Sequence, residues 1–250
     1  MRKREVAFYS RGEKIVGTIF LPDDYKEGTK VPAIIPCSGY TGINAAYPTL
    51  LAEFFTQYGY GCLGFDYRGW LPSEGKVGVT TAEDWYFDIE AAYMYAQQVP
   101  EFQKENVGLF GWGFSAPVVI KLAANYPEIK AVGCGNGIYN GKRCLKSYLA
   151  WEDYVKMTDI VREDAIERAV TGEGATTNAY QQMGHGIYYA YLSGNKPELT
   201  KEWLVNENPL AYRKQSGRNK TFMDLGTTKD AIENVWHGEF PPRQSFAATE

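Results

Sequence analysis

Two kinds of apolar pattern alternate along the first half of the chain. Short, nearly unbroken apolar runs lie at Val31–Cys37 and Gly61–Tyr67, as expected for strands that are covered on both faces. Between them, Tyr47–Tyr58 has apolar residues at helical spacing. This order of strand, helix and strand predicts a βαβ unit with a parallel sheet.

The alternation continues on both sides of this unit. Val6–Tyr9 and Lys14–Leu21 are β-branched and aromatic runs joined by the turn residues 11–13, which predicts an antiparallel hairpin at the sheet edge. Further helices are predicted at Thr81–Gln98, with Thr81 as the cap, and at Ala116–Tyr126, and further strands at Asn106–Phe110 and Ala131–Cys134. The pattern therefore predicts an α/β fold with a mostly parallel, doubly wound sheet.

Beyond about residue 140 the pattern becomes that of amphipathic helices, such as Ser147–Thr158 and Arg162–Val170, and no strand pattern interrupts them. A helical stretch inserted after a sheet strand would lie over the carboxyl ends of the strands, where open α/β sheets bind ligands. Only twenty residues follow Asp230. We expect one domain over residues 1–250, a helical cap insertion over residues 140–206, and a shortened C-terminal end.

Composition narrows the class of partner. The net charge is −4, and the 26 Lys and Arg residues are scattered, so we expect no nucleic-acid partner. No apolar run of about 18 residues occurs, so we expect no membrane partner and a cytoplasmic location. The four cysteines (Cys37, Cys62, Cys134 and Cys144) have no metal-site spacing, so we expect buried reduced thiols, no metal and no cofactor.

The segment Asn106–Pro117, NVGLFGWGFSAP, has the order of strand, sharp turn and helix that is typical of a nucleophile elbow. It resembles the elbow of the α/β-hydrolase superfamily, in the X-Pro dipeptidyl-peptidase, cocaine-esterase and dienelactone-hydrolase-like group. Three other segments resemble that group in the same order: Cys37–Gly42, Phe65–Gly75 and Trp151–Glu173. The resemblance covers about residues 5–175 and implies an α/β-hydrolase fold with hydrolase-type chemistry.

The resemblance places Gly113 at the position of the nucleophilic serine. A second frame, Gly113–Pro117, would make Ser115 the nucleophile, but we favour a structural role for Ser115 as a hydroxyl that caps the following helix. The family's loop histidine is Ser38 in this chain, and Leu71 replaces a family glycine. Several motifs have therefore changed together.

A serine hydrolase also needs a base and an acid. Asp230 is the acid that the resemblance implies, yet His237 follows it by only seven residues, which is too few for the family pattern. His185 is the other histidine, in a glycine- and tyrosine-rich segment. We keep both histidines as candidate bases, because neither is placed by a motif.

The oxyanion apparatus consists of backbone amides, which need no particular side chain. The resemblance implies Tyr40 and Phe114 as its two donors. Aromatic residues make up 15% of the chain, and we expect some of them to bind substrate. The candidates are Trp112, Trp151, Tyr154, Tyr188, Tyr189 and Tyr191.

Three functional hypotheses remain open. The leading one is an enzyme that binds an apolar or aromatic acyl, lactone or β-keto substrate and stabilises an oxyanion or enolate without a serine acyl-enzyme. The alternatives are an inactive homologue that binds a small-molecule ligand or a partner, and an ordinary esterase or peptidase that uses Ser115. A homodimer is possible in each case.

Overall fold

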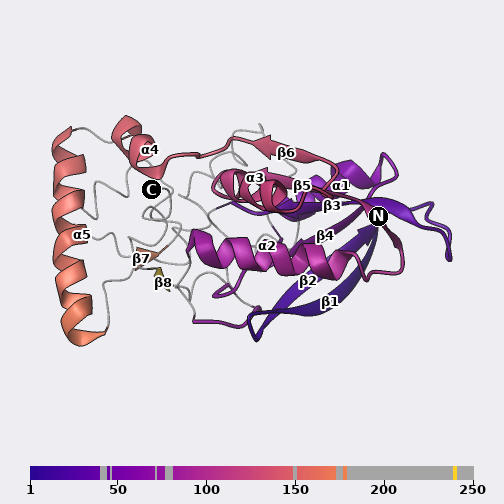
Figure 1. Cartoon of the computed structure of the whole chain (residues 1–250), viewed down its shortest axis with the longest axis horizontal. Coiled ribbons are helices and arrows are strands. Elements are labelled where there is room, and N and C mark those ends of the chain that lie inside the picture. The colour runs from indigo at the N-terminus through magenta and orange to yellow at the C-terminus, as the bar shows by residue number, and fades with distance from the viewer. Residues whose placement is uncertain are drawn as a thin grey trace, which may run out of the picture. The chain divides into compact units, whose positions relative to one another are not determined.

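A six-stranded sheet runs through the first half of the chain (Figure 1), with the strand order β1-β2-β4-β3-β5-β6. The strands are β1 (Arg2–Ser10), β2 (Glu13–Leu21), β3 (Val31–Cys37), β4 (Gly61–Phe65), β5 (Phe102–Trp112) and β6 (Val132–Gly135). Pairing is antiparallel between β1 and β2 and between β2 and β4, and parallel among β4, β3, β5 and β6. The predicted α/β class, with an antiparallel edge on a mostly parallel sheet, is confirmed.

The computed structural model describes residues 1–39, 44–45, 47–70, 72–76, 81–148, 151–172, 177–178 and 239–240. The chain divides into two units. The first consists of residues 1–76 and 81–139, and the second of residues 77–80 and 140–250.

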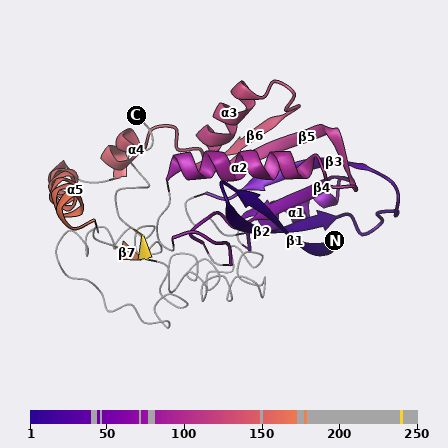
Figure 2. The same cartoon turned by 60° about the horizontal axis from the view of Figure 1, so that its bottom comes forward.

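Helices cover both faces of the sheet in the first unit. Figure 2 shows α2 (Ala82–Ala96) and α3 (Ser115–Asn125) on one face and α1 (Tyr47–Thr56) on the other. Helix α2 packs against α3, whereas α1 packs against β3 and β4. The Thr81 hydroxyl accepts a hydrogen bond from the Asp84 backbone N–H at 3.0 Å, so the predicted cap of α2 is confirmed. The sheet is therefore doubly wound.

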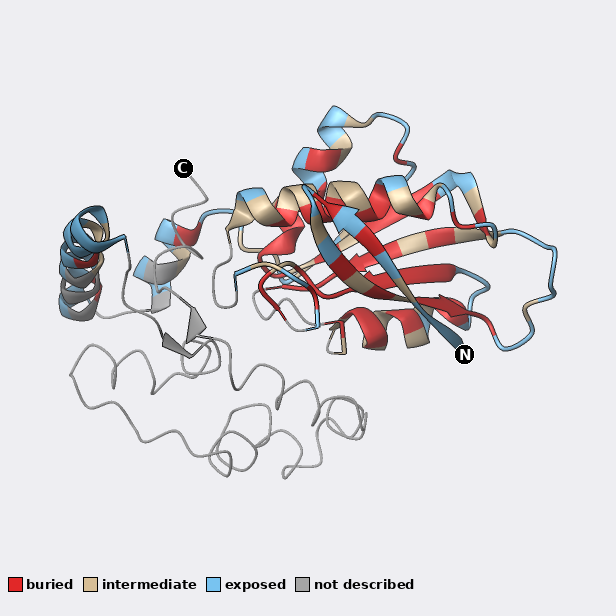
Figure 3. Cartoon of the chain, turned by 90° about the horizontal axis from the view of Figure 1, so that it is seen from below, coloured by how far each residue is buried: buried red, intermediate tan, exposed pale blue. Residues whose placement is uncertain are grey.

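The core lies along the central strands, where buried residues follow one another (Figure 3). All five residues of β4 are buried, as its unbroken apolar sequence predicted. The loop after β4 is also buried, because the rings of its residues Tyr67 and Trp70 are almost fully covered. Tyr67 packs against the equally buried Trp85 of α2, with ring centroids 5.8 Å apart. This packing fixes the loop beneath the carboxyl ends of the strands.

The second unit contains α4 (Gly141–Tyr148) and α5 (Trp151–Thr171). The sequence pattern predicted helices at Ser147–Thr158 and Arg162–Val170, whereas in the structure α4 ends at Tyr148 and α5 is one continuous helix of 21 residues. A short antiparallel pair, β7 (Thr177–Asn178) with β8 (Glu239–Phe240), also corrects the expectation that no strand interrupts the helical region. The cap over residues 140–206 stays a prediction. Among the described residues, no helix is long and apolar enough to cross a membrane.

Candidate active site

The predicted strand-turn-helix lies at the end of β5. This strand ends at Trp112 and α3 begins at Ser115, so only two residues make the turn. Gly113 takes a φ of +61°, a left-handed conformation that glycine adopts at no steric cost. The Gly113 N–H donates to the Gly135 carbonyl at 2.9 Å, and its own carbonyl accepts from the Ile138 N–H at 3.1 Å. These bonds tie the turn to the segment that follows β6.

Two glycines, Gly111 on β5 and Gly39 just after β3, allow other backbone segments to come close to this turn. A Cβ on Gly111 would lie 2.7 Å from the Cα of Ala116, so α3 can approach β5 only because residue 111 has no side chain. A Cβ on Gly39 would lie 2.8 Å from the Trp112 carbonyl oxygen. The loop after β3 is thereby pressed against the elbow.

Among the described residues, the space beside Gly113 is open. Within that part of the chain, a Cβ on Gly113 would meet only the Cα of Gly39, at an ordinary contact distance of 3.8 Å. The position therefore has room for a side chain or for a ligand atom, although its φ would strain any residue other than glycine. Gly113 differs in this respect from Gly111, which has no room.

Ser115 is fully buried, and its hydroxyl is used in packing. Its Oγ accepts a hydrogen bond from the Trp112 backbone N–H at 2.8 Å and lies 2.9 Å from the Cys37 carbonyl, to which it donates. Ser115 therefore has a structural role, as we favoured, but it is not the residue that caps α3. Phe114 occupies the cap position without a side-chain hydrogen bond, and Ser115 instead joins the ends of β3 and β5 to the first turn of α3.

Ser38 has a feature that the sequence did not reveal. Its side chain is only 1% exposed, and within the described part of the chain its hydroxyl has no hydrogen-bond partner. Buried polar groups are normally paired, so an orphaned hydroxyl calls for an explanation. Ser38 precedes Gly39, whose Cα would lie 3.8 Å from a Cβ on Gly113, so Ser38 is one residue away from the elbow contact. The sequence marked Ser38 only as the replacement of a family histidine.

Tyr67 places a second buried hydroxyl in this region. It lies beside the Cys37 thiol and the Ser115 hydroxyl but makes no hydrogen bond of ordinary geometry among the described residues. Burial raises the pKa of Tyr67 well above its usual value, and the neighbouring Cys37 and Asp88 raise it further. Tyr67 is therefore neutral and can act only as a hydrogen-bonding group.

Asp66 and Arg68 stabilise the loop that follows β4. The Asp66 carboxylate accepts from the Asn44 N–H at 2.7 Å, while its backbone carbonyl accepts from the Ser73 hydroxyl at 2.6 Å. Arg68 forms an ion pair with the buried Asp88 at 2.6 Å. Burial raises the pKa of Asp66 to about 7, and the hydrogen bond from Asn44 opposes this shift.

The aromatic candidates that the structure describes fall in two places. In the first unit, the Trp112 ring stacks on Tyr47 with centroids 4.7 Å apart. In the second unit, Trp151 stacks on Tyr154 at 5.8 Å, and the Lys146 ammonium lies over the Tyr154 ring at 5.2 Å. Trp151 is 69% exposed, whereas Tyr154 is buried. Their expected role in substrate binding stays a prediction.

Several predicted site residues lie outside the described residues. They are Tyr40, His185, Tyr188, Tyr189, Tyr191, Asp230 and His237. The structure thus brings together Gly113, Phe114 and Ser115 of the predicted set. The base, the acid and one of the two oxyanion donors stay predictions.

The cysteines require a correction. Cys37 and Cys62 are buried free thiols, and burial raises both pKa values. Cys134 is exposed and Cys144 is partly exposed, so the expectation of burial was wrong for these two. Cys134 lies on β6, which has a neighbouring strand on only one side among the described residues. No cluster of potential metal ligands occurs in the described ranges.

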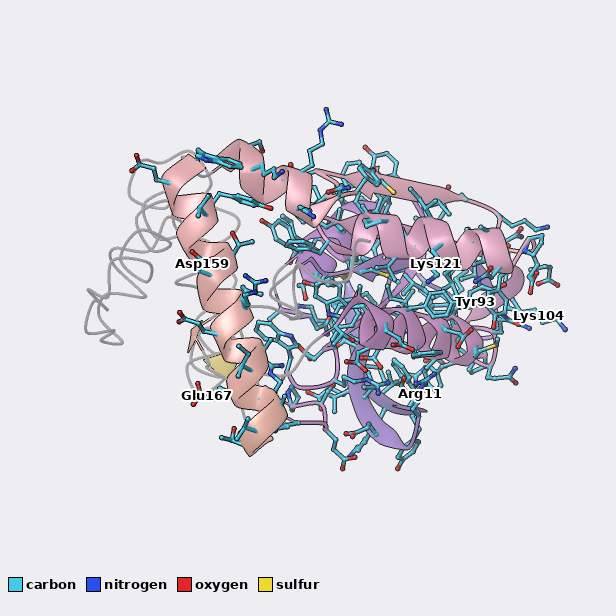
Figure 4. All side chains as sticks on the ribbon, turned by 60° about the vertical axis from the view of Figure 1, so that its left-hand side comes forward. Arg11, Tyr93, Lys104, Lys121, Asp159 and Glu167 are labelled. Atoms are coloured by element: carbon cyan, nitrogen blue, oxygen red, sulfur yellow. The ribbon has the colours of Figure 1, made fainter. Side chains whose placement is uncertain are left out.

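The first unit also has an open groove of about 600 Å³ between β1 and α2. Its lining includes Arg11, which Figure 4 labels at the β1–β2 turn and whose guanidinium lies over the Phe87 ring at 3.1 Å. The Tyr126 hydroxyl donates to Glu90 at 2.7 Å on the same lining. None of the elbow residues lines this groove, so it is separate from the candidate active site.

Comparison with known proteins now places the chain in a family. The family model of the X-Pro dipeptidyl-peptidase (S15) family matches residues 11–243. The chain belongs to this family of α/β hydrolases, and the resemblance of its motifs is confirmed.

Solved structures with the same fold agree with this assignment. A hypothetical protein, PA2218 from Pseudomonas aeruginosa, is 21% identical with a TM-score of 0.62, over 71% of this chain and 56% of that one. The α/β hydrolase GrgF from Penicillium sp. sh18 is 19% identical with a TM-score of 0.58, over 71% of this chain and 58% of that one. At these identities the likeness shows the fold alone.

Among curated proteins, an Escherichia coli protein named "Uncharacterized 31.7 kDa protein in traX-finO intergenic region" is 22% identical over 173 residues. That match covers 68% of this chain and 60% of the relative, so the chain spans about three fifths of its length. The quorum-quenching protein AidA of Acinetobacter baumannii (strain MDR-ZJ06) is 33% identical over 115 residues, which is 43% of this chain and 36% of that protein.

Proposed function

We propose that this chain binds an apolar or aromatic acyl, lactone or β-keto compound at the elbow and stabilises an oxyanion or enolate there without a serine acyl-enzyme. The observation that carries this proposal is Gly113. It lies in the turn between β5 and α3 with a φ of +61° and, among the described residues, open space beside it. The motif resemblance implies that this is the position of the family's nucleophilic serine. A glycine has no nucleophile, so the site can act only through the groups around it.

Three donors serve the developing negative charge in this proposal. The motif resemblance implies the backbone amides of Phe114 and Tyr40 as two of these donors, and the N-terminus of α3 adds the positive end of the helix dipole. The Ser38 hydroxyl is the third donor, since it is buried, orphaned and next to the glycine that touches the elbow. For an ester or lactone, water attacks the carbonyl carbon while His185 accepts its proton. The tetrahedral oxyanion then collapses, the C–O bond to the leaving alcohol breaks, and the alkoxide takes the proton back from His185, directly or through a cap tyrosine.

The geometry of Ser115 gives no support to an ordinary esterase that uses it as nucleophile. Its hydroxyl is fully buried, and hydrogen bonds to Trp112 and Cys37 hold it between β3, β5 and α3. A nucleophile must reach the substrate and a base. The same observation favours a second candidate function, a homologue that binds such a ligand without turning it over.

The test is product formation by the full chain from aryl esters, aromatic lactones and β-keto esters, measured by liquid chromatography with mass spectrometry. We expect Ser38→Ala to lower kcat/KM by about tenfold or more through the loss of one donor. It should not lower stability, because it removes a buried hydroxyl that has no partner among the described residues. Ser147→Ala, a change on the exposed side of α4, is the matched control and should leave kcat/KM unchanged.

Three results would decide against the proposal or a part of it. Binding of these compounds in calorimetry without any product would favour the second candidate, the ligand-binding homologue. Turnover that Ser38→Ala does not alter would remove Ser38 from the site, and turnover that is abolished by Ser115→Ala without unfolding would restore the serine route.

A further inference from the structure

Helix α5 has one exposed face that is apolar at both ends and charged in the middle. Trp151 and Val155 lie near its N-terminus, and Ile166 and Val170 lie near its C-terminus, with exposed fractions of 69%, 39%, 63% and 81%. Helical geometry of 100° per residue places all four within about a third of a turn. Asp159 and Arg162 are exposed on the same face, between the two apolar pairs.

The buried residues of α5 lie outside this face. Asp164, on the opposite side, is 5% exposed and accepts an ion-pair hydrogen bond from Arg168 at 2.9 Å, and Tyr154, at the flank of the face next to Trp151, is 7% exposed. The exposed apolar residues therefore do not belong to the packed side of the helix. Large apolar residues gathered on one exposed face indicate an interaction surface.

The order of residues on this face is symmetric about its centre. A two-fold axis between positions 160 and 161 would set Trp151 of one copy against Val170 of another, and Val155 against Ile166. The same axis sets Asp159 of each copy against Arg162 of the other, which gives two pairs of opposite charge. A surface that is complementary to itself in this way is what an isologous dimer requires.

The charged pair at the centre is available for this contact. Neither Asp159 nor Arg162 makes an ion pair with another residue in the described ranges. Figure 4 shows Asp159 and Glu167 pointing outward from α5. Trp151 is held in place by stacking on Tyr154, so it is a pre-ordered anchor of the kind that dominates interface energies.

We propose that α5 is a dimer interface, in which two copies of this chain pair antiparallel through the face formed by Trp151, Val155, Asp159, Arg162, Ile166 and Val170. This gives the expected homodimer a definite surface, and it assigns Trp151 to the interface in place of the ligand. The helix has 21 residues, so the contact is roughly 32 Å long. A contact between two single helices of this length buries less surface than the ~1,600 Å² of a standard protein–protein interface. We therefore expect a dissociation constant in the micromolar range.

The test is sedimentation velocity of the full chain over a concentration range of about 1 to 200 µM, where micromolar dimers dissociate. Arg162→Glu would set like charges against each other twice and should weaken dimerisation at least about tenfold. The double variant Asp159→Lys with Arg162→Glu recreates both opposite-charge pairs and should restore it. Arg143→Glu, on the exposed side of α4, makes the same change of charge outside the face and should have no effect.

Each outcome bears on the proposal. A wild-type chain that stays monomeric over the whole range would overturn it, as would dimerisation that Arg162→Glu leaves unchanged. Failure of the double variant to dimerise, with normal helical content by circular dichroism, would also overturn it, because the charge pairing would then not set the contact. Rescue by the double variant cannot arise from a merely structural role of Arg162 and would support the antiparallel register.

Discussion

Gly113 makes the sharp turn between β5 and α3 through its backbone alone. Its φ of +61° and its bonds to Gly135 and Ile138 hold the turn, and among the described residues the space beside it is open. A side chain at this position would be strained by that φ. If the proposed site is correct, its chemistry depends on the groups around Gly113 and not on a nucleophile at this position.

A serine introduced at position 113 tests whether the chain has an acid and a base that could activate it. We expect Gly113→Ser to raise the hydrolysis of 4-nitrophenyl esters by no more than about tenfold, because a lone serine is a poor nucleophile at its free pKa. A fluorophosphonate probe should not label the wild-type chain stoichiometrically. Rapid hydrolysis by Gly113→Ser would reveal an intact acid and base and contradict this account.

Asp66 makes stability depend on pH. Burial raises its pKa from an ordinary 3.8 to about 7, so the folded chain binds this proton more tightly than the unfolded chain does. The stabilising contribution is complete below the unfolded pKa and is lost as pH rises toward 7, by up to about 4 kcal/mol. Asp66→Asn lacks this titration, so its melting temperature relative to wild type should rise between pH 4 and pH 8. A difference that is constant across this range would refute the shift.

At the scale of single residues, the sequence predicted the turn at Gly113 but not which buried hydroxyls lack a hydrogen-bond partner. The order of residues 106–117 predicted a strand, a turn at Gly113 and a helix, because local backbone preferences determine those features. The burial of Ser115 and Ser38 depends on the packing of β3, β5 and α3, which are distant in sequence. No local pattern could reveal which hydroxyl was paired and which was not.

At the scale of elements, the contact between β5 and α3 is controlled by Gly111. A Cβ there would meet backbone of Ala116 at 2.7 Å, so Gly111→Ala must push the helix away and should cost about 3 kcal/mol. Gly113→Ala meets no close atom and should cost only the left-handed strain of about 1–2 kcal/mol. Urea unfolding measures both changes.

Gly28→Ala is the matched control for this comparison. Gly28 has a φ of +80°, and a Cβ added to it would meet nothing within 4 Å, so it shares the strain of Gly113 but lies away from the elbow. Its cost should equal that of Gly113→Ala. Equal costs for Gly111→Ala and Gly113→Ala would show that α3 does not pack as closely as described.

Periodicity located most elements but not every boundary. Val31–Cys37 was predicted with the correct ends, because a strand buried on both faces has an unbroken apolar sequence. The strand predicted at Asn106–Phe110 extends over Phe102–Trp112, since its polar first half pairs with β3 only through a register shift near Val31. Helix α5 was divided in the prediction because its exposed face carries apolar residues that disturb the amphipathic pattern.

At the scale of the whole molecule, the chain has the fold of its family and carries the site proposed at the elbow. Membership of the X-Pro dipeptidyl-peptidase (S15) family is shown by the match over residues 11–243, and the sheet and elbow agree with it. Fold and function are separable, because many activities share one α/β-hydrolase framework. The α5 face adds an assembly that is independent of the elbow, so each can be tested without the other.

The most direct test of the central claim is the intact mass of the full chain during turnover, sampled by rapid quenching with an aryl ester, an aromatic lactone and a β-keto ester. The account predicts product formation while the protein keeps its unmodified mass of 28.1 kDa at every time point. A serine hydrolase would instead form an acyl-enzyme that is heavier than the free protein by the mass of the substrate's acyl group less the one hydrogen that it replaces. Such an adduct, mapped to any serine of this chain, would contradict the claim that the elbow works without a covalent nucleophile.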